Sequence, residues 1–259
     1  MYEGRLAEIS VSNASLEIRL DINQRFSTRD FHGWLQSRLG VCAGEAVLDV
    51  GCGSGAQSLA MLKSVGPGGS VSALDLSSDS IAGLRTAARN SPNLQATVSD
   101  MQDVGRVIRD EFRVKQYDLA QSTYALYYSA RPLEVLDSMR SALKPGGRLA
   151  VCTPNDPHSL SLLCGRFLEL PRLVVECGRF GPEVLEPYFR HHFTYVDIHL
   201  LRNEMTFSRS DDVMQLLQNA AYFDASIERL VRNVIDNAIA ETGSFNAQKN
   251  SYLIVGHLD

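Results

Sequence analysis

The chain has 259 residues, of which 44% are hydrophobic and 21% are charged. This balance is typical of a folded protein and excludes a disordered or fibrous chain. Twenty-five Lys and Arg against 30 Asp and Glu give a formal charge of −5. Such a charge provides no general attraction to phosphate backbones or anionic lipid, so we expect neither a nucleic-acid partner nor a membrane partner.

The apolar residues nowhere form a run of about 18 that could span a bilayer, and the first residues lack the basic and then apolar pattern of a signal peptide. We therefore predict a cytoplasmic protein. The five cysteines are odd in number and form no CxxC pair, which argues against a disulfide framework or a zinc site. We expect free thiols.

Short apolar runs and amphipathic stretches follow one another along the chain. Residues 1–45 have a helical pattern, with apolar residues three and four positions apart. Strands are then predicted at 46–50, 70–76, 94–99, 117–121 and 148–153, separated by segments of helix length. Ser77 and Ser78 can cap one of these helices, and Pro132 suits the first turn of another. This alternation predicts an α/β fold with a doubly wound sheet.

The regularity weakens after residue 153. Several prolines within 155–192 favour an insertion of short helices. A strand at 193–201, a helical stretch at about 210–241 and a strand at 250–258 are predicted to complete the chain. We expect N-terminal helices (1–45) as a cap or lid on one domain (46–259). Equally, the helical segments could simply cover the sheet.

Three alternating glycines follow the first predicted strand, in the sequence Val47-Leu48-Asp49-Val50-Gly51-Cys52-Gly53-Ser54-Gly55-Ala56. A glycine turn at the carboxyl end of a strand lets a ligand contact the backbone. Read as GxGxxA, the loop also fits the dinucleotide fingerprint, with Asp75 placed to bind a ribose. The loop alone therefore leaves two interpretations open.

Acidic residues at the ends of successive strands help to separate these interpretations. Asp49 would crowd a pyrophosphate but suits a ligand that carries an ammonium group. Asp75 follows the second apolar run and can accept two ribose hydroxyls. Asp100 with Met101 follows the third run, where they offer an acceptor for an exocyclic amine and an apolar wall for a ring.

In this order, the motifs of residues 45–155 resemble those of the class I S-adenosylmethionine-dependent methyltransferases. The resemblance rests on VLDVGCGSG, on Asp75, on Ser99-Asp100-Met101, on Tyr117-Asp118-Leu119 and on LKPGG. It implies a seven-stranded, mostly parallel sheet in the order 3-2-1-4-5-7-6, with the last strand antiparallel.

The resemblance also implies a binding site for S-adenosylmethionine, with S-adenosylhomocysteine as product. The residues that it places around this cofactor are Asp49, Gly51, Cys52, Gly53, Asp75, Leu76, Asp100, Met101, Gln121 and Ser122. In that arrangement Asp75 takes the ribose hydroxyls, while Asp100 and Met101 take the adenine. Gln121 and Ser122 lie near the methionine moiety.

Methyl transfer is an in-line displacement, so positioning the nucleophile can supply most of the catalysis. A base is needed only for an acceptor that carries a proton. Tyr124, Tyr127 and His158 are the candidates, although each could instead be a packing residue. Gln121-Ser122-Thr123 lacks the Asn/Asp-Pro-Pro pattern of enzymes that methylate adenine or amide groups. It also supplies no acid for a metal, so we expect none.

The residues therefore favour methyl transfer to an O, N or C atom of a small molecule. A nicotinamide-dependent oxidoreductase is a weaker alternative, because no Tyr-xxx-Lys pair follows the fourth strand. A non-catalytic protein that binds S-adenosylmethionine is the third, since an acceptor site need not contain a diagnostic residue. The sequence predicts neither the acceptor nor the oligomeric state.

Overall fold

The structure is a computed structural model that describes residues 13–259; the first part of the predicted N-terminal helices lies outside them. The described residues form two compact units. Unit 1 comprises the residues up to Asp30, Pro154–Arg179 and Leu200–Ser251, and unit 2 comprises Phe31–Thr153, Phe180–His199 and Tyr252–Asp259. The glycine loop and every predicted cofactor residue belong to unit 2.

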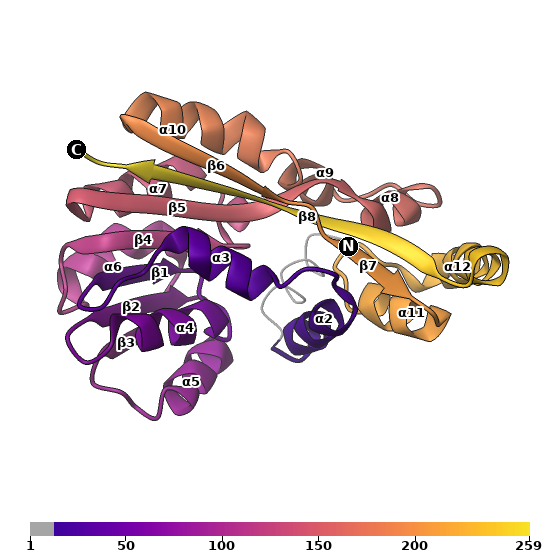
Figure 1. The fold of residues 1–259 in the computed structure, drawn as a ribbon, viewed down its shortest axis with the longest axis horizontal. Coiled ribbons are helices and arrows are strands. Elements are labelled where there is room, and N and C mark those ends of the chain that lie inside the picture. Colours follow the sequence, from indigo (N-terminus) through magenta and orange to yellow (C-terminus); the bar gives the residue numbers. More distant parts are fainter. Residues whose placement is uncertain (1–12) are drawn as a thin grey trace. The chain divides into compact units, whose positions relative to one another are not determined.

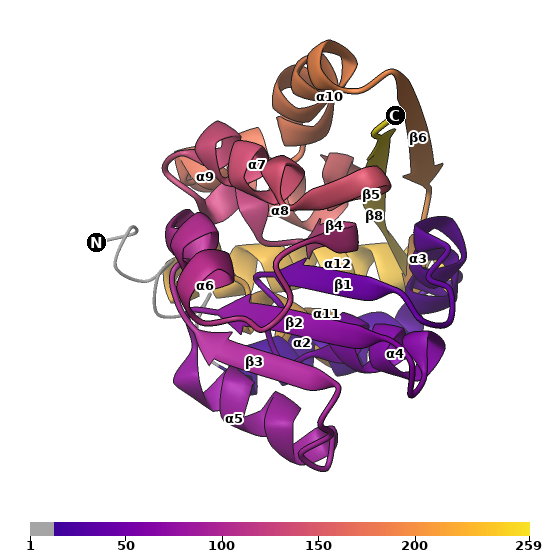
Figure 2. The same cartoon turned by 90° about the vertical axis from the view of Figure 1, so that its left-hand side faces the viewer.

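The sheet has the predicted doubly wound topology (Figures 1 and 2). Its strands are β1 (Ala46–Val50), β2 (Ser70–Asp75), β3 (Leu94–Val98), β4 (Tyr117–Thr123), β5 (Leu143–His158), β6 (Tyr195–Leu201), β7 (Glu204–Phe207) and β8 (Phe245–His257). The order is β3-β2-β1-β4-β5-β8-β6, and the pairs β3-β2, β2-β1, β1-β4 and β4-β5 are parallel. The predicted order is confirmed. The last strand becomes the eighth because the short β7, which we did not predict, precedes it.

The helices of unit 2 alternate with these strands. They are α3 (Phe31–Leu39), α4 (Ala56–Val65), α5 (Ser78–Ala87), α6 (Val104–Asp110), α7 (Pro132–Ser141) and α10 (Glu186–His192), with shorter turns η1 (Met101–Asp103), η2 (Leu126–Tyr128) and η3 (Gly181–Leu185). Both predicted helix starts are confirmed. The Ser77 hydroxyl accepts a bond from the Ser80 N–H at 3.2 Å, and Pro132 occupies the first turn of α7.

The predicted strand bounds hold to within two residues at the centre of the sheet, whereas β5 and β8 each begin five residues before the predicted start. We expected Lys144–Gly147 to form a turn before a strand at 148. Instead β5 begins at Leu143, and its pairing with β4 shifts register between Tyr117 and Leu119. The Gly146 N–H donates to the Asp259 carbonyl at 3.2 Å. The glycines therefore form an irregularity within a longer strand.

The centre of the sheet is buried on both faces, which explains the continuous apolar runs of its strands. Leu48, Val50 and Ala120 pack into one cluster, whereas Val47 and Leu119 pack into another; all five are fully buried. Asp49 pairs with Ala73 of β2 and Gln121 of β4 in the parallel register. The carboxyl ends of β1, β2 and β4 therefore lie at one edge, where parallel sheets bind ligands.

Unit 1 has its own apolar core. The elements of unit 1 are α2 (Asn13–Phe26), α8 (Ser159–Gly165), α9 (Arg172–Cys177), β7, α11 (Ser210–Gln218), η4 (Ala225–Ile227) and α12 (Glu228–Thr242). Ile22, Phe207, Val213, Phe223 and Ile235 are among its buried core residues. β7 pairs antiparallel with the first part of β8. None of the helices in residues 13–259 is long and apolar enough to cross a membrane.

Candidate functional site

The glycine loop has a backbone that only glycine adopts without strain. Gly51, Gly53 and Gly55 have φ values of +73°, +52° and +85°. A Cβ atom on Gly51 would lie 2.3 Å from the Cβ of Ala125, and one on Gly55 would lie 2.4 Å from a methyl of Leu84. The loop is therefore both turned and closely packed against Ala125 and Leu84.

The Asp75 carboxylate is held in place by two backbone donors. Its Oδ2 accepts from the Gly53 N–H at 2.7 Å, and its Oδ1 accepts from the Ser77 N–H at 2.9 Å. A carboxylate oxygen has two acceptor positions, so each oxygen can accept one more bond. The half-buried Asp75 is therefore oriented to accept two hydroxyl groups. The next side chain, Leu76, is 60% exposed and offers an apolar surface beside it.

Asp49 lies beneath the loop and is only 1% exposed. Its two oxygens accept bonds from the Ser58 hydroxyl and the Gln121 amide. The Gln121 oxygen in turn accepts from Thr123 at 2.6 Å. Burial raises the pKa of Asp49 to about 7, although both hydrogen bonds lower it. A cation bound near the loop would lower this pKa and stabilise the charged form.

Asp100 and Met101 lie where β3 leads into η1. The Asp100 Oδ1 accepts from the Gln102 N–H at 2.9 Å and caps this turn. The terminal methyl of Met101 would be 3.8 Å from a Cβ placed on Gly51, so the side chain lies beside the loop. At the end of β4, the Ser122 hydroxyl is buried and has no hydrogen-bond partner in the described part of the chain.

These residues fit S-adenosylmethionine. The cofactor carries a ribose diol for Asp75, an adenine ring for the Leu76 and Met101 side chains, and an ammonium group that suits the buried charge of Asp49. The clash that a Cβ would cause at Gly51 keeps this part of the loop free of side chains. Cys52 is half-buried in the same loop, and burial raises the pKa of its thiol well above its ordinary value. Its thiol is therefore protonated and unreactive.

The tyrosines predicted at the acceptor side occupy different surroundings. Tyr124 has a φ of +55°, a strained conformation for a residue with a side chain, and its ring meets Phe31 edge-on at 5.6 Å. Tyr127 instead packs against Tyr128 and Phe180, with ring centroids 4.6 and 6.4 Å away. The strained backbone thus makes Tyr124 a stronger candidate than Tyr127 for a residue on the acceptor side.

A polar network beside the loop was not predicted. Gln57, in the first turn of α4, is within 2.9 Å of the His32 Nδ1 and accepts from the Gln36 amide at 2.7 Å. Gln57 is 8% exposed. It therefore connects α3 to the helix that follows the glycines. In the sequence, Gln57 is marked by its place two residues after Gly55.

His158, the third candidate base, belongs to unit 1 rather than to the unit that holds the loop. Burial and the charge of Lys249 lower its pKa to about 4, so its imidazole is neutral at pH 7. A neutral imidazole can act as a base or as a hydrogen-bond partner.

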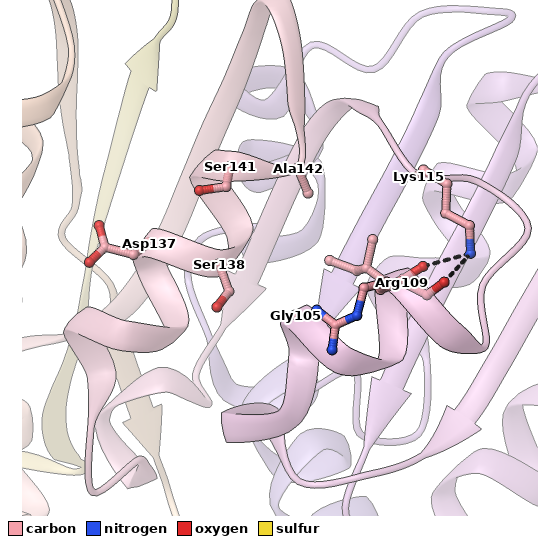
Figure 3. Close-up of a pocket in the computed structure, with 8 residues that line it drawn as sticks. Gly105, Arg109, Lys115, Asp137, Ser138, Ser141 and Ala142 are labelled. Carbon is pink, nitrogen blue, oxygen red and sulfur yellow. Dashed lines mark hydrogen bonds between the residues drawn. The ribbon is translucent and has the colours of Figure 1, made fainter.

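A separate groove of about 350 Å³ lies between α6 and α7 (Figure 3). The residues that line it are Gly105, Ile108, Arg109, Lys115, Asp137, Ser138, Ser141 and Ala142. Lys115 donates to the carbonyls of Ile108 and Arg109 at 2.9 and 2.8 Å and so caps the end of α6. None of these eight residues is a predicted site residue, and the lysine has a structural role.

Comparisons with known proteins identify relatives of this chain. A family described as "Methyltransferase domain" matches residues 42–220. A malonyl-[acyl-carrier protein] O-methyltransferase of Halalkalibacterium halodurans is 31% identical over 108 residues, which cover 42% of this chain and 38% of that protein. A demethylmenaquinone methyltransferase of Staphylococcus carnosus is 31% identical over 109 residues, 42% of each chain. The match thus spans about two-fifths of the length of these relatives.

A solved structure shares the fold over most of the chain. The N-methyltransferase NodS of Bradyrhizobium japonicum, solved in complex with S-adenosyl-L-homocysteine, is 14% identical and has a TM-score of 0.50. The similarity covers 88% of this chain and 85% of that one. At this identity the likeness shows the fold alone. Since the family match covers more than half of the chain and agrees with the order of its motifs, the chain belongs to the methyltransferase domain family, of the class I S-adenosylmethionine-dependent type.

Proposed function

We propose that this protein transfers the methyl group of S-adenosylmethionine to an O, N or C atom of a small organic molecule. The observation that carries the proposal is the carboxylate of Asp75, which two backbone N–H groups orient at the edge of a side-chain-free loop. When bound, S-adenosylmethionine supplies an electrophilic methyl group on a sulfonium. The chain's own residues then have to bind and orient the cofactor and the acceptor, and they have to exclude water.

In this proposal the cofactor-binding roles are those that the order of the motifs implies. Asp75 accepts the two ribose hydroxyls, and Leu76 and Met101 pack against the faces of the adenine. Asp100 accepts from the adenine amine. The backbone of Gly51, Cys52 and Gly53 and the side chains of Gln121 and Ser122 surround the methionine part.

Asp49 acts in this proposal as a buried charge. Because both of its oxygens already accept bonds and its side chain is almost inaccessible, it favours the cofactor's ammonium group through its field. Gln121 connects Asp49 to the proposed position of the ammonium group, because its amide donates to Asp49 and it lies at the carboxyl end of β4.

Tyr124, Tyr127 and His158 stay candidates for contact with the acceptor, and Tyr124 is the strongest because of its strained backbone. A small-molecule acceptor is supported by the demethylmenaquinone methyltransferase among the relatives. It also accords with the absence of a general positive charge. A cytoplasmic location stays a prediction from the sequence.

The experiment is transfer of a labelled methyl group from S-adenosylmethionine into a panel of phenols, carboxylic acids and amines. We expect turnover with at least one class, and a strong loss of turnover at limiting cofactor in Asp75→Ala. Asp79→Ala is the matched control, because Asp79 is an exposed carboxylate on the neighbouring helix α5. Cofactor binding with no transfer across the panel would favour the non-catalytic alternative. Failure to bind the cofactor would refute the proposal.

A further inference from the structure

Three side chains beside the glycine loop form a hydrogen-bonded chain that the proposed function does not use. The Gln36 amide of α3 donates to the Gln57 oxygen at 2.7 Å, and the Gln57 nitrogen lies 2.9 Å from the Nδ1 of His32. Gln57 belongs to the first turn of α4 and is almost buried, whereas His32 is exposed. All three residues belong to unit 2, in which α3 lies beside α4 (Figures 1 and 2).

This chain of hydrogen bonds determines which nitrogen of His32 carries the proton. An amide nitrogen only donates hydrogen bonds, and the Gln57 oxygen already accepts from Gln36. The Gln57 nitrogen therefore donates to the His32 Nδ1, which is the unprotonated acceptor. In a neutral imidazole the proton is then on Nε2. His32 thus offers an N–H donor, rather than a base, to a ligand.

The first residues of α3 lie between two parts of the candidate site. On one side, His32 bonds to Gln57 in the turn that follows the glycine loop. On the other side, the Phe31 ring meets the ring of Tyr124 edge-on at 5.6 Å, directly after the end of β4. The helix α3 therefore begins at the edge of the sheet where the carboxyl ends of β1 and β4 meet. His32 belongs to the part of unit 2 that receives the cofactor.

The backbone of the glycine loop offers few hydrogen-bond donors to a ligand. The N–H groups of Gly51 and Cys52 both donate to the Leu74 carbonyl, at 2.8 and 3.0 Å. The Gly53 N–H donates to the Asp75 carboxylate at 2.7 Å. Because these N–H groups are occupied, a ligand carboxylate bound at the loop needs a donor from another segment of the chain.

Two consecutive residues of α4 orient groups of opposite character. The Ser58 hydroxyl donates to the buried carboxylate of Asp49, which in the proposed function favours the ammonium group of the cofactor. Gln57, the preceding residue, holds His32 with a donor on its other nitrogen. The amino-acid end of S-adenosylmethionine carries an ammonium group and a carboxylate on one carbon atom. A negative charge and an N–H donor held by neighbouring residues are complementary to this pair.

We propose that His32 donates a hydrogen bond from Nε2 to the carboxylate of the cofactor's methionine part, and that Gln57 is the positioning residue that fixes the imidazole. This contact rests on the proposed function, because it requires the same cofactor at the same loop. His32 lies outside the motifs of residues 45–155 and outside the matched residues 42–220, so neither of them assigns this role.

The test compares S-adenosylhomocysteine with 5′-(3-aminopropylthio)-5′-deoxyadenosine, which lacks only the carboxylate, by calorimetry on the full chain. His32→Phe keeps an aromatic ring, and it should lower the affinity for S-adenosylhomocysteine at least about fivefold through loss of a charge-assisted hydrogen bond. The affinity for the analogue should change by less than about twofold, because the analogue has no carboxylate to accept this bond. The melting temperature should stay close to that of the parent, since His32 is exposed.

His191→Phe is the matched control, because it makes the same substitution at an exposed histidine on α10. We expect it to leave the affinities for both ligands unchanged. An equal loss for both ligands in His32→Phe, or no loss for either, would overturn the inference.

The positioning role of Gln57 requires a readout of the imidazole itself. In the nitrogen NMR spectrum of the parent protein, the neutral His32 should have Nε2 protonated and Nδ1 unprotonated. Gln57→Met should populate the other tautomer, and it should weaken binding of S-adenosylhomocysteine but not of the analogue. A proton on Nδ1 of the neutral imidazole in the parent would contradict the assigned donor.

The same titrations separate this contact from the proposed function. Binding of S-adenosylhomocysteine that His32→Phe leaves unchanged would refute the role of His32 and leave the proposed function intact. A loss in His32→Phe that depends on the carboxylate, without methyl transfer to any acceptor in the panel, would support the contact and contradict the proposed catalysis. No binding of S-adenosylhomocysteine by the parent would refute both.

Discussion

Binding of S-adenosylhomocysteine is expected to release a proton from Asp49. In the ligand-free protein, burial holds the pKa of this carboxyl at about 7, against an ordinary value of 3.8. The product has the same ammonium group as the cofactor, and a positive charge near the loop favours the carboxylate. The bound protein therefore holds fewer protons below pH 7, and the affinity rises with pH up to that point.

The magnitude follows from the two pKa values. A tenfold change in an acid dissociation constant corresponds to about 1.4 kcal/mol. A full return of the pKa from about 7 to 3.8 would thus couple at most about 4 kcal/mol to binding. If the pKa returns only part of the way, less free energy is coupled to binding. The affinity should still rise several-fold per pH unit between about pH 5 and pH 7, and level off above about pH 8.

Calorimetry in buffers of different ionisation enthalpy measures the released proton directly. We expect up to about one proton near pH 6, close to none near pH 8, and none at either pH in Asp49→Asn. Asp118→Asn is the control, because Asp118 lies at the opposite end of the sheet and bonds to the Ala46 N–H and Lys144. Proton release that persists in Asp49→Asn, or an affinity that is flat from pH 5 to 7 in the parent, would refute this reasoning.

Three further variants test the site and the fold. Gly51→Ala should abolish binding of S-adenosylhomocysteine and lower the melting temperature, because its Cβ would meet Ala125; Gly44→Ala, with a positive φ but nothing within 4 Å, should lower the melting temperature alone. Asp75→Ala should weaken binding by about 1 to 3 kcal/mol in calorimetry, and unchanged affinity would show that the ribose lies elsewhere. Arg148→Ala should lower the free energy of unfolding in urea by about 2 to 4 kcal/mol, because the mostly buried guanidinium bonds to Glu45 at 2.9 Å and to the Leu39 carbonyl at 2.9 Å. A loss below about 0.5 kcal/mol would contradict that role.

The central strands could be predicted because their burial on both faces requires continuous apolar runs. β1 has the predicted bounds, and β2 and β3 each end one residue before the prediction. The short β7 could not be predicted. It has four residues, and its strand conformation depends on pairing with β8, which lies about 40 positions later in the chain. Such pairing leaves no local pattern.

The candidate site likewise has features that the sequence predicts and features that it does not. Motif order predicted the glycine loop and Asp75 because consecutive residues create that geometry. The contact between His32 and Gln57 joins residues from two different helices, so no single stretch of sequence contains both. Nor could the sequence show that Asp49 is enclosed by Ser58 and Gln121, which changes its role from a contact to a buried charge.

Calorimetric titration of S-adenosylhomocysteine and of NAD into the same protein tests the central claim most directly. Asp75, the glycine loop and the buried Asp49 together predict saturable binding of S-adenosylhomocysteine at one site per chain, with no measurable binding of NAD. Binding of NAD without binding of S-adenosylhomocysteine would contradict the assignment of this edge of the sheet to a sulfonium cofactor.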